Sequence, residues 1–205
     1  MAKIITISRE FGSGGRELGK RLADLLGYEF YDKEIISKVA QKQKLDEEYV
    51  EKNISYNSIK SIPLTYGRSF KLSNSSQNIQ TNLMVEEKQV LLDIAKSNNN
   101  CIIVGRNADI ILNEYNPLTI FVCSNLESKI ERCKKRMTED KKKSIKSIEH
   151  EIKQIDKMRI KTREILTDGK WGDKSQYHLI VNTAEWDLGE LALALVEYIK
   201  RWFKD

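Results

Sequence analysis

The residues best suited to chemistry near the start of the chain form a glycine-rich turn, Gly12-Ser13-Gly14-Gly15-Arg16-Glu17. An apolar, strand-like run over residues 4–8 precedes the turn, and an amphipathic helical pattern over residues 17–26 follows it. Glycines allow several backbone N–H groups to converge on one anion, and a helix N-terminus adds partial positive charge. This order therefore predicts a phosphate-binding loop made of these six residues.

The turn departs from the usual nucleotide-kinase loop, whose pattern is G-x-x-x-x-G-K-[ST]. When the glycines are aligned, Arg9 replaces the first glycine, Gly15 replaces the lysine, and Glu17 falls near the hydroxyl position. That lysine normally reaches the β- and γ-phosphates, and the hydroxyl holds Mg²⁺. Arg16 is the nearest cation, one residue later, and its permanent bidentate charge favours it as the replacement. We expect Glu17 to point outward and to complement the helix dipole.

A dinucleotide-binding turn is the alternative interpretation of the same residues. Gly12 and Gly14 fit its spacing, and Asp32 lies about 20 residues further on, where such turns place a ribose-binding acid. The third glycine of that pattern permits close packing of the helix on the strand, and Glu17 occupies its position here. The phosphate loop of a kinase is therefore the favoured interpretation.

Two arginines, Arg159 and Arg163, continue a helical stripe of isoleucines and lie one turn apart on its inward face. The stripe consists of Ile145, Ile148, Ile152 and Ile155. A cation on an inward face needs an anionic partner. Two partners are open: a carboxylate, which would make a structural salt bridge at the helix end, or a nucleotide phosphate, on which the arginines would close as a clamp.

The elements that must position these residues are indicated by short apolar runs that alternate with helical patterns. One of these patterns covers residues 77–96, and another begins at Asp187. Alternating strands and helices predict an α/β fold with a mostly parallel sheet covered on both faces. The five strand-like runs are residues 4–8, 28–31, 101–105, 118–123 and 177–182.

Length and composition limit the kinds of protein that this chain could be. The length of 205 residues predicts one domain over residues 1–205. The net charge is +5, yet residues 127–164 alone carry fourteen Lys or Arg against eight Asp or Glu. No apolar run approaches the ~20 residues that span a bilayer, and the N-terminus lacks a secretory signal pattern. Three cysteines without metal spacing indicate reduced thiols, so we expect a cytoplasmic protein without a membrane partner.

Residues 53–85 differ from the rest of the chain because they contain no Asp or Glu. They are rich in Ser and Asn and carry three cations, Lys60, Arg68 and Lys71. An acid-free segment that faces a phosphate avoids like-charge repulsion. The segment is therefore either a loosely ordered surface excursion or an inserted cap that binds an anionic acceptor, with Arg68 among the binding residues.

Four motifs, in this order and spacing, resemble the cytidylate kinase-like family of P-loop proteins. The resemblance spans nearly the whole chain and implies the three-layer P-loop NTPase fold of nucleoside monophosphate kinases, with a five-stranded parallel sheet. It also implies a helical acceptor-binding insertion after the second strand, at residues 53–85, and an Arg-rich lid after the fourth, at residues 138–163. The motifs are Ile4-Ile-Thr-Ile-Ser-Arg-Glu-Phe-Gly-Ser-Gly-Gly-Arg16, Phe30-Tyr-Asp32, Ile102-Ile-Val-Gly-Arg106 and Trp171-Gly-Asp173.

The resemblance also implies roles for single residues. Asp32 follows the second strand, where cytidylate kinases place an acidic residue near the acceptor and the metal. Arg106 falls where those kinases have Gly-Arg-Asp, with the arginine on the acceptor nucleotide. The third residue of that motif is Asn107 in this chain, and the nearest acid is Asp109. This departure leaves the identity of the acceptor and the handling of the metal open.

We therefore expect a phosphotransferase that moves the γ-phosphoryl group of ATP to a nucleoside monophosphate such as CMP, or to another small anionic acceptor. Mg²⁺ would arrive with the ATP rather than occupy a protein metal site. The expected catalytic residues are Arg16, Asp32, Arg159 and Arg163. Asp32 would orient the acceptor or a hydrated Mg²⁺, and its alternative role is to cap the helix that starts near Lys33.

Two other classes of protein compete with this expectation. A nucleotide-binding protein without turnover is favoured by the missing loop lysine and hydroxyl. A nucleic-acid-binding module would use the positive surplus of residues 127–164. In that segment the acids are interleaved with the cations and aromatic residues are absent, so it offers no stacking platform, and no nucleic-acid partner is expected.

Overall fold

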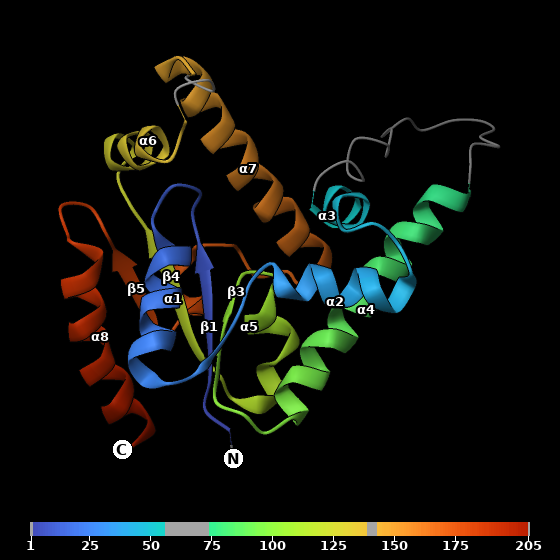
Figure 1. The fold of residues 1–205 in the computed structure, drawn as a ribbon, viewed down its shortest axis with the longest axis horizontal. Helices are drawn as coiled ribbons and strands as arrows, with labels where there is room; N and C mark the ends of the chain where they lie inside the picture. Colours follow the sequence, from blue (N-terminus) through green and yellow to red (C-terminus); the bar gives the residue numbers. More distant parts are fainter. Residues whose placement is uncertain (1, 56–73, 139–142, 205) are drawn as a thin grey trace.

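The computed structural model describes residues 2–55, 74–138 and 143–204, along which strands and helices alternate (Figure 1). The strands are β1 (Ile4–Arg9), β2 (Glu29–Tyr31), β3 (Cys101–Val104), β4 (Leu118–Cys123) and β5 (Leu179–Asn182). The helices are α1 (Gly15–Leu26), α2 (Glu34–Gln43), α3 (Glu47–Ser55), α4 (Asn74–Lys96), α5 (Ala108–Ile111), α6 (Leu126–Lys135), α7 (Ile145–Leu166) and α8 (Leu188–Phe203). Two short 3-10 helices are η2 (Asn113–Tyr115) and η4 (Lys174–Gln176).

The five strands form one parallel sheet in the order β2-β3-β1-β4-β5. β1 lies at its centre, where Ile5 pairs with Ile102 of β3 on one side and with Leu118 of β4 on the other. In open α/β sheets of this kind, ligands bind outside the carboxyl ends of the strands, where the strand order reverses. The predicted α/β fold with a five-stranded parallel sheet is confirmed, and the glycine-rich turn follows its central strand.

Both faces of the sheet are covered by helices. Successive side chains of β1 point to opposite faces, so Ile5 and Ile7 pack beneath α1 and α8, whereas Ile4 packs beneath α2, α4 and α5. Figure 1 shows these two groups of helices on opposite sides of the sheet. Full burial of such a side chain contributes roughly 1.5–3 kcal/mol. The two cores therefore hold β1 firmly, and with it the start of the turn.

The ends of the helices follow local sequence signals. Gly27 ends α1 with a φ of 67°, and its N–H bonds to the carbonyl of Ala23. Asp187 caps α8 by accepting hydrogen bonds from the N–H groups of Gly189 at 2.7 Å and Glu190 at 3.1 Å. The expected strand over residues 28–31 begins one residue late, because the N–H of Tyr28 bonds to Ala23 at the end of α1 rather than to the sheet.

Two segments expected from the sequence are only partly visible. Residues 56–73 of the expected insertion, Arg68 included, lie outside the described residues, so its role stays a prediction. Most of the expected lid is α7, while residues 139–142 also lie outside the described part. Among the residues that the structure describes, no helix combines the length and apolar character needed to cross a membrane.

Candidate functional site

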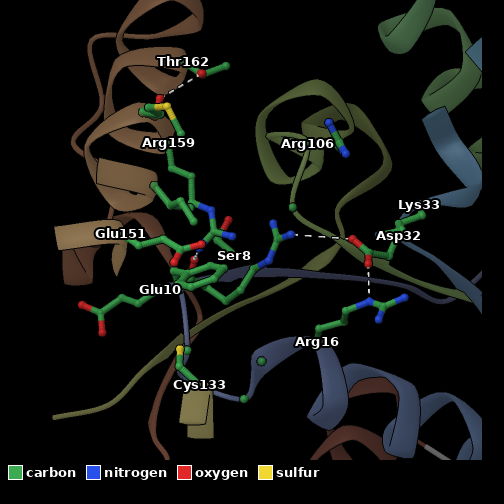
Figure 2. A pocket seen from close by; sticks show the side chains of 18 of the residues that line it. Ser8, Glu10, Arg16, Asp32, Lys33, Arg106, Cys133, Glu151, Arg159 and Thr162 are labelled. Carbon is green, nitrogen blue, oxygen red and sulfur yellow. Dashed lines mark hydrogen bonds and ion pairs between the residues drawn. The ribbon is translucent and has the colours of Figure 1, made fainter. Parts of the chain in front are cut away.

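A cavity of about 780 Å³ lies at the carboxyl ends of three adjacent strands, β2, β3 and β1. The turn after β1 forms one wall, and α7 contributes another through residues such as Arg159 and Thr162 (Figure 2). Asp32 after β2 and Arg106 after β3 also line the cavity. The topology thus brings the loop, Asp32, Arg106 and Arg159 together, although the sequence separates them by up to about 150 residues.

The backbone of the loop is held in a fixed shape from inside the protein. Gly12 and Gly14 have φ values of 77° and 83°, which favour glycine. Neighbours also lie close: a Cβ on Gly14 would meet Leu188 at 2.9 Å. The Thr183 hydroxyl donates a hydrogen bond of 2.6 Å to the Ser13 carbonyl. Gly12, Gly14 and Gly15 line the cavity, so the loop presents its backbone there.

Two members of the predicted phosphate loop point elsewhere. The Ser13 side chain is buried, and both its hydroxyl and its N–H donate to the carbonyl of Glu10, at 2.8 and 3.3 Å. Glu17 pairs with Arg21 at 3.0 Å and with Arg136 at 3.2 Å, outside the lining of the cavity. Ser13 therefore shapes the loop, and Glu17 has the outward orientation expected of it.

Asp32 is the central carboxylate of the site. It is 4 % exposed and accepts from the Nε atom of Arg16, and its other oxygen lies 3.6 Å from an Nη atom of Arg9 (Figure 2). The alternative that Asp32 caps the following helix is wrong. The N-cap residue of α2 is Lys33, and it makes no capping hydrogen bond with its side chain. The backbone N–H of Asp32 instead donates to the Glu34 carboxylate at 2.9 Å.

Arg106 is held by a buried acid that the sequence did not single out. Its guanidinium lies 3.4 Å from Glu87 of α4, and both side chains line the cavity. Burial raises the pKa of Glu87, and the charge of Arg106 opposes that rise. Arg106 itself has a φ of 59°, in the left-handed region that non-glycine residues seldom adopt. Glu87 was not predicted because only the packing of helix α4 beside β3 brings its side chain to Arg106.

Helix α7 is attached directly to the loop. Asp156 accepts a hydrogen bond of 2.7 Å from the N–H of Phe11, and Arg159 donates one of 2.8 Å to the carbonyl of Arg9. Arg159 also lies 3.2 Å from Asp156. Beneath them, Lys129 pairs with Glu10 at 2.5 Å and lies 3.9 Å from Asp156. The predicted inward direction of Arg159 is therefore observed, and this arginine reaches the edge of the cavity.

Arg163, one turn further along α7, does not line the cavity. Its side chain is 2 % exposed and forms an ion pair with Asp109, which is 7 % exposed. The guanidinium also lies over the ring of Tyr177, 5.6 Å from its centroid. This arrangement corresponds to the structural salt bridge that the sequence left open, so we do not retain Arg163 among the phosphate-binding candidates.

Arg9 is the residue that sequence reasoning missed. The alignment with the usual loop treated it only as a misplaced glycine. In the structure its side chain lines the cavity beside Gly15 and Arg16 and approaches Asp32. Burial and the neighbouring charge of Arg159 lower the pKa of Arg9 to about 9, with Asp32 opposing and Arg106 adding to the effect. An arginine at the carboxyl end of the central strand of an α/β sheet was the available signal.

The model of the cytidylate kinase-like family matches residues 4–185, which is most of the chain. The chain belongs to the cytidylate kinase-like family. A comparison with curated proteins finds no significant match.

Solved structures show the same fold as this cytidylate kinase-like chain. An uncharacterized protein from Eubacterium ventriosum is 24 % identical with a TM-score of 0.70, over 97 % of this chain and 98 % of that one. Shikimate kinase from Bacteroides thetaiotaomicron is 14 % identical with a TM-score of 0.58, over 97 % and 98 %. Shikimate kinase from Acinetobacter baumannii, in complex with shikimate, is 15 % identical with a TM-score of 0.55, over 97 % and 93 %. The fold is therefore that of P-loop kinases.

Proposed function

We propose that this protein is a phosphotransferase that moves the γ-phosphoryl group of ATP to a small anionic acceptor, with a nucleoside monophosphate such as CMP as the first candidate. The observation that carries the proposal is one cavity lined by the glycine loop, by Asp32 and by five arginines. The arginines are Arg9, Arg16, Arg106, Arg136 and Arg159. Phosphoryl transfer depends mainly on positioning and on fixed cations that stabilise charge on the transferring oxygens.

The size and the two sides of the cavity suit two substrates. Its volume of about 780 Å³ lies within the range of small-molecule sites. The donor phosphates would lie on the backbone of Gly12, Gly14 and Gly15 at the start of α1. The acceptor would bind opposite, near Asp32 and Arg106. This arrangement would hold the two reactants together without a covalent intermediate on the protein.

The residues present fit a nucleotide that carries its own Mg²⁺. Within the described residues, no group of three or more His, Cys, Asp or Glu side chains is arranged to hold a metal ion. Asp32 offers the carboxylate oxygens that Mg²⁺ prefers, and it lines the cavity near the loop. When bound, the ion would neutralise negative charge on the phosphates. Asp32 would hold the hydrated ion or orient the acceptor. In the structure its carboxylate forms an ion pair with Arg16.

Replacing Arg159 with alanine is expected to lower kcat by about one order of magnitude while changing the Kd for ATP less than about threefold. The reason is that Arg159 is tied to the loop through the Arg9 carbonyl, at the edge of the cavity where charge develops during transfer. Steady-state kinetics and calorimetric ATP binding measure the two constants. The matched control is Lys161→Ala, an exposed residue on the same helix outside the cavity lining. Equal losses of rate and affinity would assign Arg159 to ground-state binding instead.

A screen for acceptor-dependent ADP formation tests the proposed function. Mg-ATP is offered with a panel of nucleoside monophosphates and small hydroxyl-bearing acids, and Asp32→Asn serves as the control for contaminating kinases. We expect ADP formation with one class of acceptor and its loss in the variant. ATP binding without ADP formation across the whole panel would contradict the proposal and favour a nucleotide-binding protein without turnover, as the missing loop lysine suggests.

A further inference from the structure

Two arginines share a single carboxylate in the cavity. Asp32 contacts both Arg16 and Arg9, and one carboxylate balances the charge of only one guanidinium. The Arg16 side chain is 56 % exposed, so water solvates its charge, whereas the Arg9 side chain is 18 % exposed. The unbalanced positive charge therefore lies at Arg9, inside the cavity rather than at its rim.

The other charged groups around Arg9 do not remove this imbalance. Arg159 is paired with Asp156 at 3.2 Å, and Arg106 with Glu87 at 3.4 Å, so those two acids are already engaged. Both arginines act on Arg9 through their positive charge, and together with burial they lower its pKa. A partly buried cation among other cations is costly unless an anion joins it. The site is therefore incomplete without an anionic ligand at Arg9.

The backbone around Arg9 is shaped to keep its side chain in one place. A Cβ on Gly105 would lie 1.7 Å from an Nη atom of Arg9, so the guanidinium rests directly on the Gly105 backbone. A Cβ on Gly15 would lie 2.7 Å from the Arg9 Cβ atom. Gly15 is the first residue of α1. The arginine stem thus passes over the start of the helix, which is the place where a helix N-terminus attracts anions.

We propose that Arg9 is the phosphate-binding cation of this loop, taking the part of the missing lysine, and that Asp32 and Gly105 are its positioning residues. The ligand is the polyphosphate of the nucleoside triphosphate donor. Arg16, at the rim, is then a secondary contact rather than the replacement for the lysine. The inference rests on the proposed function, because it names the cation at the same donor site.

Binding of inorganic tripolyphosphate and of ATP, measured by calorimetry, tests the inference without requiring turnover. We expect Arg9→Gln to weaken both ligands at least tenfold. Arg9→Lys should retain binding within about threefold, because lysine is an established phosphate-binding cation. Arg16→Gln should lose less affinity than Arg9→Gln. The matched control is Arg201→Gln, an exposed arginine of α8 outside the cavity lining, and it should bind like the wild-type protein.

Gly105→Ala provides a second, independent test through the position of Arg9. Its Cβ would displace the guanidinium, so we expect at least fivefold weaker tripolyphosphate binding in a protein whose thermal unfolding shows that it is folded. The double variant Arg9→Gln/Gly105→Ala should bind no more weakly than Arg9→Gln alone, because both changes remove the same contact. This coupling separates positioning of Arg9 from a general effect of the glycine. The single variant Gly105→Ala also keeps the inference testable if Arg9→Gln does not fold.

The outcomes separate this inference from the function on which it rests. If the wild-type protein binds neither ATP nor tripolyphosphate, the proposed function is overturned and the inference with it. If the wild-type protein binds both, and Arg9→Gln binds them as well as the wild type does, only the role of Arg9 is overturned. A larger loss in Arg16→Gln than in Arg9→Gln would return the role of phosphate-binding cation to Arg16.

Discussion

Replacing Arg163 with alanine is expected to lower the free energy of unfolding by about 3–5 kcal/mol. The substitution would leave the carboxylate of Asp109 buried without its charge partner, and this ion pair is among the least exposed in the described residues. One oxygen of Asp109 already lacks a hydrogen-bond partner, so little is available to replace the arginine. Urea unfolding followed by circular dichroism measures the loss directly. ATP affinity should stay unchanged, because Arg163 lies outside the cavity lining.

Two further variants distinguish the ion pair from a general packing defect. Arg163→Met with Asp109→Leu removes both charges, and it should recover much of the stability, because apolar replacement of a whole buried pair is often neutral. Arg201→Ala, at an exposed position of α8, should change the free energy of unfolding by less than about 0.5 kcal/mol. A small effect of Arg163→Ala on stability, together with a large loss of ATP affinity, would restore the phosphate clamp as its role.

Replacing Asp32 with asparagine is expected to lower the rate of phosphoryl transfer by about 10²–10³-fold. Its carboxylate organises Arg9 and Arg16 at the centre of the cavity, and it is the buried acid that both the donor and the acceptor would approach. Asparagine keeps a hydrogen-bonding oxygen but loses the charge. The Kd for ATP should change by less than about threefold, because the loss of a negative charge near the phosphates offsets the looser positioning of Arg9.

The control for this variant is Asp24→Asn, an exposed α1 residue whose carboxylate pairs only with Lys20 at 2.8 Å in the described contacts. It should leave both the rate and ATP affinity unchanged. Single-turnover kinetics with saturating ATP isolates the transfer step. A rate for Asp32→Asn within about threefold of the wild type would exclude a direct part for Asp32 in transfer.

Local signals explain what could be predicted of the fold. β4 matches its expected range of 118–123, because a continuous apolar run is typical of a buried parallel strand. Helix α8 begins where expected, because Asp187 accepts hydrogen bonds from the N–H groups of Gly189 and Glu190 in its first turn. The expected strand over residues 177–182 begins at Leu179 instead, because Tyr177 ends the short 3-10 helix η4.

The site was harder to predict because its contacts join distant parts of the chain. Ile148 and Ile152 of the expected isoleucine stripe are buried, whereas Ile145 is 53 % exposed. The sequence could not choose between a phosphate and the carboxylate of Asp109, 54 residues away, as the partner of Arg163. Glu87 lies on the helix expected over residues 77–96, and the sequence pattern did not show that its side chain meets Arg106. Arg9 was overlooked because the comparison with the usual loop pattern noted only that a glycine was missing at this position. It did not consider what an arginine side chain could bind there.

Transfer of the labelled γ-phosphoryl group of ATP, followed directly, tests the central claim. The wild-type protein is mixed with γ-³²P-ATP, Mg²⁺ and the acceptor found by the screen, and the products are separated by chromatography. If the protein is a phosphotransferase, the label will move to the acceptor much faster than it appears as inorganic phosphate, and Asp32→Asn will slow the transfer by about 10²–10³-fold. Label that stays in ATP while the protein binds ATP tightly, or that appears only as inorganic phosphate, would contradict the claim.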